Sequence, residues 1–321
     1  MKGVKKKLQK KYLVLFLLII FSLSIFSKTY YTGINYTFRN TKYKNYLVLT
    51  SSIQRIVAIF NLESKKIEYY FDNVGFYPSI SFLKDNKLLV IDTVGKKIIL
   101  INIKTNQKNV KYFENKLMFY QRYNDIVYVL DTKGNIYGYD FNLNMVSYHK
   151  FLSSPNYFYI YKDYPLGLYV WREDFDVEYK DKLYNFNLIT PTLVVDNYII
   201  DTRGGTILDF ITKITYKASP YISFALNWKG ILYFSSMYSN EIYTLKNGKI
   251  VLWNKLKYSA TNGKIINNNM YILSAPYNKL LKIDNNGNIS IFETSKYPID
   301  IFKHNNEIVV VGAENGEINI F

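Results

Sequence analysis

The feature that most constrains the fold of this chain is a short apolar run that recurs along it. Eight such runs occur at intervals of 29 to 42 residues, and each ends in a small or polar residue. The runs begin at Tyr46, Leu88, Val127, Leu168, Asn197, Leu232, Met270 and Ile308. A regular period of about this length indicates a repeat architecture, in which each unit buries its apolar surface against its neighbours.

Each run is followed by further strand-like segments separated by turns. The gap to the next segment is rich in Gly, Asn and Asp, as in DTVGK, DTKGN and DTRGGT, residues that supply the positive φ of tight hairpins. A third segment follows another turn, as in KIEYYF and NISIF. Proline fits the first residue of a strand because its missing N–H costs no ladder bond there. Prolines that precede a further apolar run are Pro78, Pro155, Pro191, Pro220 and Pro298. Each unit is therefore predicted to contain four short antiparallel strands.

Four-stranded units of about 40 residues, apolar on both faces, are typical of the blades of a β-propeller. The second strands lack polar alternation, as expected if both faces of every unit are buried. A β-sandwich is the alternative all-β fold, but it does not require eight copies of one strand–turn–strand spacing. We predict an all-β propeller of eight four-stranded blades over residues 28–321. Merging the short unit at 188–219 with its neighbour would give seven blades.

Two segments carry a family resemblance. YPIDIFKHNNEIVVVGAENGEINIF and APYNKLLKIDNNGNISIFETSKYP resemble the NHL and YVTN families of propeller repeats. The resemblance covers most of residues 45–321 and implies the fold without implying a function. Related propeller enzymes, such as streptogramin lyases and lactonases, use histidines or clustered carboxylates with a divalent metal. The Trp-Asp signature of WD40 repeats and the Trp-anchored repeat of quinone-cofactor propellers are absent.

The last repeat, residues 298–321, supplies three strands and leaves an apolar edge. A propeller is circular, so an N-terminal strand can complete this blade and remove the open edge. GINYTF, residues 33–38, resembles the outer strands, and we expect Ile34–Phe38 to pair beside Glu317–Phe321. Seven residues separate Phe38 from Tyr46. The same segment is therefore the alternative candidate for the inner strand of the first blade, which would leave the last blade three-stranded.

The N-terminal segment predicts export. MKGVKKKLQKKY carries six lysines and no acidic residue, and the apolar run LVLFLLIIFSLSIF follows at residues 13–26. This pattern predicts a signal peptide, or an uncleaved signal-anchor helix, over residues 1–27. The rest of the chain is expected to be periplasmic or otherwise extracytoplasmic, either anchored in the cytoplasmic membrane or secreted.

Charge and cysteine content exclude several classes of function. Six of the 41 Lys and Arg residues lie in the N-terminal segment, and the others are scattered singly among 25 acidic residues. Because a nucleic-acid-binding protein needs a basic stripe or a recognisable module, we predict no nucleic-acid partner. The chain has no cysteine, which excludes disulfides, Cys-ligated zinc and a Cys nucleophile.

The residues that end the apolar runs are expected at one mouth of the central channel. From them we predict a ligand- or partner-binding set made of Asp92, Asp131, Arg172, Asp201, Ser236 and Ser274. The alternative interpretation is structural. Each Asp would then accept N–H bonds from its own turn, as in Asx turns.

Catalytic chemistry is poorly supplied. Asp174, Asp176 and Glu178 alternate in REDFDVEYKD and suggest either a calcium patch or, as we favour, a solvated strand face paired with nearby basic side chains. His149 and His304 are not expected to converge, because one follows an outer strand and the other precedes an inner turn. We assign no catalytic residue, no metal ligand and no cofactor.

These observations predict an exported, monomeric propeller that acts as a non-catalytic interaction module. Its partner would be an unidentified protein or an envelope component, with the membrane as a further contact if the N-terminal segment is retained. The alternative is a metal-dependent hydrolase or lyase of the lactonase or streptogramin-lyase type, with its site at the channel mouth.

Overall fold

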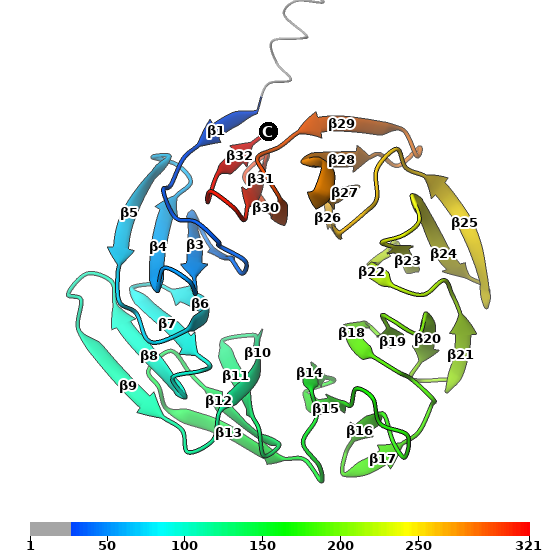
Figure 1. Ribbon diagram of the computed structural model, residues 1–321, viewed down its shortest axis with the longest axis horizontal. Coiled ribbons are helices and arrows are strands. Elements are labelled where there is room, and N and C mark those ends of the chain that lie inside the picture. The colour runs from blue at the N-terminus through cyan, green and yellow to red at the C-terminus, as the bar shows by residue number, and fades with distance from the viewer. Residues whose placement is uncertain (1–26) are drawn as a thin grey trace, which may run out of the picture.

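The computed structural model describes residues 27–321, so the predicted signal peptide or anchor lies almost wholly outside the described residues. This part of the chain forms eight four-stranded antiparallel sheets arranged as blades around a central axis (Figure 1). The β-propeller prediction is confirmed with eight blades, since the short fifth repeat forms a blade of its own. Within residues 27–321 no helix is long and apolar enough to cross a membrane.

The first four blades follow the chain in order, each running from the inner strand to the outer strand. Blade 1 contains β2 (Thr41–Tyr43), β3 (Tyr46–Ser51), β4 (Ile56–Asn61) and β5 (Lys66–Phe71), and blade 2 contains β6 (Pro78–Lys84), β7 (Lys87–Asp92), β8 (Lys97–Asn102) and β9 (Lys108–Tyr112). Blade 3 contains β10 (Leu117–Tyr123), β11 (Ile126–Asp131), β12 (Asn135–Tyr139) and β13 (Met145–Lys150), and blade 4 contains β14 (Tyr157–Tyr161), β15 (Tyr164–Leu168), β16 (Val177–Tyr179) and β17 (Lys182–Tyr184).

The last four blades repeat this order, except that the outer strand of blade 8 comes from the start of the described chain. Blade 5 contains β18 (Pro191–Val195), β19 (Tyr198–Asp201), β20 (Thr206–Asp209) and β21 (Ile214–Lys217), and blade 6 contains β22 (Ile222–Trp228), β23 (Ile231–Ser236), β24 (Glu241–Lys246) and β25 (Lys249–Lys255). Blade 7 contains β26 (Asn262–Ile266), β27 (Asn269–Ser274), the 3₁₀ turn η1 (Ala275–Tyr277), β28 (Lys279–Ile283) and β29 (Ile289–Glu293), and blade 8 contains β30 (Pro298–His304), β31 (Glu307–Gly312), β32 (Ile318–Ile320) and β1 (Lys28–Tyr30).

The core lies between neighbouring blades. The second and third strands of blade 1 are buried along their centres, and their side chains pack against the corresponding strands of blade 2. Val48 and Ile59, for example, share one apolar cluster with Leu88, Val90 and Ile99. Outer strands such as β5 alternate between exposed and partly buried residues because only one face is covered. A blade therefore cannot bury its apolar surface without both neighbours.

Proline fixes where three of the inner strands begin. Pro78, Pro191 and Pro298 are the first residues of β6, β18 and β30, and in each strand the register shifts within the next two residues. Such a bulge bends the strand and increases its twist. The predicted role of these prolines as strand-initiating residues is thus confirmed in three blades.

An N-terminal strand completes blade 8, but it is not the predicted one. Strand β1 pairs antiparallel with β32, with Lys28 opposite Ile320 and Tyr30 opposite Ile318. The predicted segment Ile34–Phe38 forms neither this strand nor the inner strand of blade 1, which is β2. It lies in the linker from blade 8 to blade 1, and Figure 1 shows this part of the chain bending toward the axis.

Ile34 explains why the segment resembled a strand. Its side chain is buried in the cluster between blades 8 and 1, where Tyr30 also packs, and the N–H of Thr37 donates to the carbonyl of Ala313 at 3.2 Å. Gly33 has a φ of +72°, which turns the chain away from β1 before Ile34. The segment thus buries Ile34 and Thr37 and is hydrogen-bonded, but its backbone is irregular and it leaves Tyr36 and Phe38 exposed.

We expect Tyr30→Ala to destabilise the propeller, because Tyr30 packs against Phe60 of blade 1 with ring centroids 6.0 Å apart and anchors the closing strand. The free energy of unfolding should fall by about 1–3 kcal/mol. Tyr31→Ala is the matched control, because that side chain is 77% exposed and its removal should change stability by no more than about 0.5 kcal/mol. Equal effects of the two substitutions in thermal denaturation would show that β1 does not hold the ring closed.

Candidate functional site

The propeller has two different faces. The first residue of an inner strand lies beside the last residue of the second strand of the same blade. The paired residues are Pro78 and Asp92, Pro191 and Asp201, and Pro298 and Gly312. The linkers between blades and the turns between second and third strands therefore share one face, which we call the linker face. The turns that leave the inner strands and those that lead to the outer strands share the opposite face, which we call the hairpin face.

All six predicted binding residues lie at the linker face, but they do not converge. Each belongs to a different blade, from Asp92 in blade 2 to Ser274 in blade 7. Five of them are the last residue of a second strand, and Arg172 follows such a strand. The second strands lie farther from the channel than the inner strands do. The six residues thus lie on one face of the described structure but in six separate blades, and their role as one binding set stays a prediction.

Asp92 and Asp201 bind the linker that enters their own blade. Asp92 is fully buried, and its carboxylate accepts hydrogen bonds from the N–H groups of Phe76 at 2.6 Å, Tyr77 at 2.9 Å and Gly95 at 2.8 Å. Asp201 is also fully buried and accepts from the N–H groups of Ile189, Thr190 and Gly204 at 2.8–3.0 Å. Both carboxylates hold a turn and a linker together, and this is the structural interpretation that the sequence left open.

In two of the three Asp-Thr-x-Gly turns, the glycine is required by close approach to the aspartate. A Cβ at Gly95 would lie 2.1 Å from Oδ2 of Asp92, and a Cβ at Gly204 would lie 2.0 Å from Oδ2 of Asp201. No side chain fits at these distances. In these two turns the buried carboxylate therefore explains the glycine, whereas Gly134 in the Asp131 turn has a φ of +80° and a Cβ there would lie 2.5 Å from the carbonyl oxygen of Ser153.

Asp131 also holds its own turn together, and it binds side-chain amides as well as backbone N–H groups. Its carboxylate accepts from the N–H groups of Lys133 and Asn135 and from the Nδ2 atoms of Asn115 and Asn135, at 2.8–2.9 Å. Burial opposes ionisation, but these hydrogen bonds outweigh it and lower the pKa of Asp131 below its ordinary value of 3.8. Asp131 is therefore bound as a carboxylate in the folded state.

The other three predicted residues differ among themselves. Ser236 donates its hydroxyl to the carbonyl of Pro220 at 2.7 Å, whereas the buried Ser274 hydroxyl has no hydrogen-bond partner among the described residues. Arg172 is exposed, donates to the Ser153 hydroxyl at 2.9 Å and lies over the Phe175 ring. That these residues bind a ligand or partner stays a prediction.

The acidic stretch in blade 4 is not the solvated strand face that we favoured. Asp176 and Glu178 are both buried, and only Asp174 is exposed. Oδ2 of Asp176 accepts from the N–H groups of Phe186 and Leu188 at 2.8 Å, and burial raises the pKa of this carboxyl. The reason for the difference is that the segment lies inside blade 4, where β16 pairs with β15 on one side and with β17 on the other.

The two histidines lie in different blades, His149 in blade 3 and His304 in blade 8, as expected. His149 nevertheless meets acidic groups of blade 4. A ring nitrogen of His149, a carboxylate oxygen of Glu178 and a carboxylate oxygen of Asp181 all lie within 4.8 Å of one another. Both oxygens of Glu178 already accept hydrogen bonds, from the Leu152 N–H and the Tyr169 hydroxyl. The sequence could not show this group, because it depends on how two blades pack.

The linker face exposes large apolar side chains from most of its loops. We define the aromatic face as the exposed apolar residues of the linkers and of the turns between second and third strands. They are Tyr31, Tyr36, Phe38, Ile53, Phe76, Tyr77, Val94, Leu152, Trp171, Ile189, Tyr221, Met237, Tyr238, Tyr277 and Tyr297. In the described chain the turns of the hairpin face expose one comparable side chain, Ile211. Apolar exposure is thus strongly one-sided.

Several of these side chains are organised by neighbours. Tyr221 and Tyr238 stack edge to face with ring centroids 4.9 Å apart, although Tyr238 remains 76% exposed. The guanidinium of Arg203 lies 5.7 Å from the Trp171 ring, and that of Arg55 lies 4.9 Å from the Phe76 ring. Arginine over an exposed aromatic ring presents a charged and an apolar group side by side.

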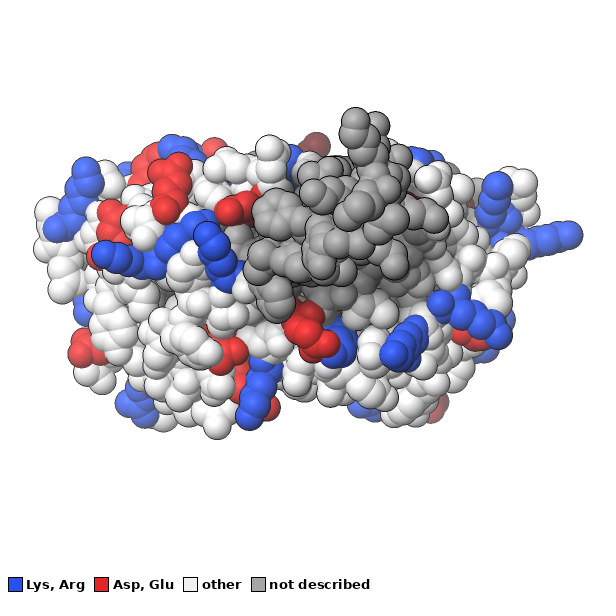
Figure 2. Space-filling model, turned by 90° about the horizontal axis from the view of Figure 1, so that it is seen from above, with Lys and Arg blue, Asp and Glu red and all other residues white. Residues whose placement is uncertain are grey.

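The rim of the disc exposes apolar side chains of the outer strands, such as Tyr70, Tyr112 and Val251, among charged ones. Figure 2 views the molecule from one edge and shows Lys and Arg side chains interspersed with Asp and Glu. On this side no patch of one sign stands out, which agrees with the scattered lysines of the sequence. A mixed charged surface of this kind favours solubility.

The fold and these faces define a β-propeller, and comparisons with known proteins show the same. No protein-family model and no curated protein sequence matches the chain. Among solved structures, the computationally designed Ika8 protein matches with a TM-score of 0.69 at 13% identity, covering 91% of this chain and 98% of Ika8.

Two natural proteins show similar likeness. BamB from Moraxella catarrhalis matches with a TM-score of 0.60 at 15% identity, covering 91% of this chain and 98% of BamB. Virginiamycin B lyase from Staphylococcus aureus matches with a TM-score of 0.57 at 10% identity, covering 92% of this chain and 98% of the lyase. At such low identity these likenesses show the propeller fold and nothing about activity.

We expect Asp131→Asn to lower the free energy of unfolding at pH 7 by about 1–3 kcal/mol, because it weakens hydrogen bonds to a buried charge. The pKa of Asp131 is lower in the folded state than in the unfolded state. Its contribution to the free energy of unfolding is therefore fully present above the unfolded pKa of about 4, and it is lost as the pH falls through the folded pKa. The difference between wild type and variant should therefore shrink from pH 5 to pH 2.

Urea denaturation across this pH range measures the effect. Asp174→Asn provides the control, since that carboxyl is exposed and should leave stability within about 0.5 kcal/mol of wild type at every pH. A gap for Asp131→Asn that stays constant down to pH 2 would contradict the assignment of Asp131 as a buried carboxylate.

Proposed function

We propose that this chain is an exported, non-catalytic β-propeller that binds another protein through its aromatic face. The single observation that carries the proposal is the one-sided exposure of large apolar side chains. Monomeric soluble proteins rarely expose extended apolar surface, and such surface commonly marks an interaction site. The other face of the same disc has turns of ordinary polar composition, so the asymmetry does not come from composition alone.

The kinds of residue at the aromatic face support a protein partner. Tyr, Trp and Arg are enriched among the residues that dominate binding energy in protein interfaces. This face presents Trp171 beside Arg203, Phe76 beside Arg55 and the pair Tyr221–Tyr238. Three such groups on separate blades suit a partner that covers a broad, flat surface.

The N-terminal sequence supports export. Six lysines followed by an apolar run at residues 13–26 fit a signal peptide or a membrane anchor. In the anchored form the propeller would stand close to the membrane, because the closing strand begins at Lys28. The partner would then be an envelope protein or another envelope component.

The metal-dependent hydrolase or lyase is the alternative. Its predicted carboxylates at the linker face lie in separate blades, and Asp92, Asp131 and Asp201 accept several N–H bonds each. An enzyme of this type would need ligands from elsewhere in the molecule. No observation at this face favours it.

We expect Trp171→Ala combined with Tyr238→Ala to reduce the amount of partner that copurifies with the tagged protein from its native cells by about tenfold or more, because hot-spot truncations cost about 2 kcal/mol or more each. The measurement is quantitative mass spectrometry of the eluate, which also reads the N-terminus of the protein. Both side chains are exposed, so the variant should keep the wild-type melting temperature.

Tyr112→Ala combined with Tyr148→Ala is the matched control. These tyrosines are 68% and 54% exposed but lie on the outer strands β9 and β13. Loss of the same partner in both double variants, or in neither, would contradict binding through the aromatic face. A catalytic function would become the better account if no partner is retained by the wild type.

A further inference from the structure

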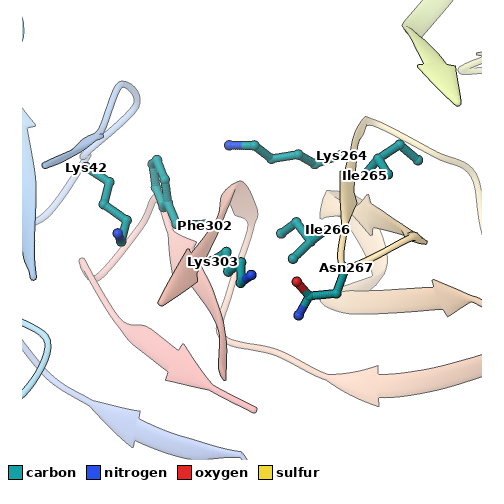
Figure 3. Close-up of a pocket in the computed structure, with 7 residues that line it drawn as sticks. All are labelled: Lys42, Lys264, Ile265, Ile266, Asn267, Phe302 and Lys303. Carbon is teal, nitrogen blue, oxygen red and sulfur yellow. The ribbon is translucent and has the colours of Figure 1, made fainter. Parts of the chain in front are cut away.

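A pocket of about 480 Å³ lies in the central channel, away from the aromatic face. Its walls come from the inner strands of blades 7, 8 and 1, and include Lys42, Lys264, Asn267, Phe302 and Lys303 (Figure 3). Asn267 follows the last residue of β26, and Lys303 is the penultimate residue of β30. The pocket therefore opens where the inner strands end, at the hairpin face.

Three lysines from three blades line this pocket. Figure 3 shows the side chains of Lys42 and Lys264 approaching Phe302 from opposite sides, with Lys303 beside it. Nζ of Lys264 lies 5.1 Å from the Phe302 ring centroid and donates to the carbonyl of Ile301 at 3.2 Å. Lys264 is thus held over the ring with part of its ammonium group left free to bind.

The three ammonium groups are not neutralised by ion pairs. Within residues 27–321 none of them forms a salt bridge, whereas Lys44, one position beyond β2, pairs with Asp85 at 3.0 Å. Burial and the charge of Lys264 lower the pKa of Lys42, and burial also lowers the pKa of Lys264. Lys42 and Lys264 therefore lie close enough for their charges to repel each other, while the exposed side chains of Lys264 and Lys303 can be reached by an anion from solvent.

The acidic group that acts on Lys264 is Asp300. Its Oδ2 accepts hydrogen bonds from the N–H and the side-chain amide of Asn40 at 3.2 and 2.9 Å, and burial raises the pKa of its carboxyl. Arg39 adds a further cation to the channel, where it binds the Tyr120 hydroxyl. Asp300 thus offsets part of the positive charge of Lys264 and Arg39.

We propose that this pocket binds a small oxyanion with two or more negative charges, carried on phosphate or carboxylate groups. Such a ligand would replace the mutual repulsion of the lysines with charge-assisted hydrogen bonds to Lys42, Lys264 and Lys303. The volume lies within the range of small-molecule sites, and Phe302 supplies an apolar wall for the carbon part of a ligand. The site is independent of the aromatic face.

The test is isothermal titration of the full chain with inorganic tripolyphosphate and, separately, with citrate, at 50 mM and 300 mM salt. We expect saturable binding of at least one anion that weakens at the higher salt. Binding of tripolyphosphate alone would assign a phosphate ligand, and binding of citrate alone would assign a carboxylate. Binding of both would support an oxyanion site of either kind. Binding of neither at millimolar concentration would overturn the proposal.

Variants locate the site. Lys42→Gln combined with Lys264→Gln should weaken anion binding by about tenfold or more, because it removes two charged donors. Lys44→Gln is the matched control, as it removes one positive charge nearby but outside the pocket, and binding should stay within about twofold. Equal loss in both variants, or in neither, would show that any anion binds elsewhere.

The melting temperature of the unliganded protein provides an independent reading. The double variant removes like-charge repulsion, so it should melt at the same temperature as wild type or higher. A variant that melts at the wild-type temperature and no longer binds would support the proposal. A clear fall in the melting temperature would contradict the repulsion from which the site is inferred.

Discussion

The pairing of β1 with β32 is the interaction on which the rest of this structure depends. Every blade is apolar on both faces, so each needs two neighbours, and only a closed ring gives all eight blades two. The closing contact consists of three residue pairs between β1 and β32 and of the side chains of Tyr30 and Ile34, which pack in the cluster between blades 8 and 1. A short strand thus completes an apolar interface that extends around the whole molecule.

Closure also positions both surfaces with proposed functions. The linker from β1 to β2 contributes Tyr36 and Phe38 to the aromatic face, and β2 contributes Lys42 to the channel pocket. The buried carboxylates of Asp92, Asp131 and Asp201 then fasten linkers and turns in other blades, so that exposed aromatic side chains stand on ordered loops. The residues that fix the loops and the residues that contact a partner are therefore different, although they are neighbours in the sequence.

Most of the fold could be predicted from the sequence, because the apolar runs and their turns repeat with nearly constant spacing. The closing strand could not, because Lys28–Tyr30 is three residues long and has no strand pattern of its own, whereas the irregular segment Ile34–Phe38 alternates apolar and polar residues as a strand does. The carboxylates were found from the Asp-Thr-x-Gly repeat, and their structural role was one of two interpretations. The pocket lysines were missed because Lys42, Lys264 and Lys303 are far apart in the chain and carry no motif.

The account assigns partner binding to one face of the disc, and site-specific photocrosslinking in the native cell tests this claim most directly. A photoreactive residue is placed at Tyr238 on the aromatic face, at Tyr148 on the rim or at Ile211 on the hairpin face, and crosslinked proteins are identified by mass spectrometry. The account predicts one dominant adduct that forms from position 238 and not from positions 148 or 211. An adduct of equal yield from all three positions, or one formed from the hairpin face alone, would contradict it.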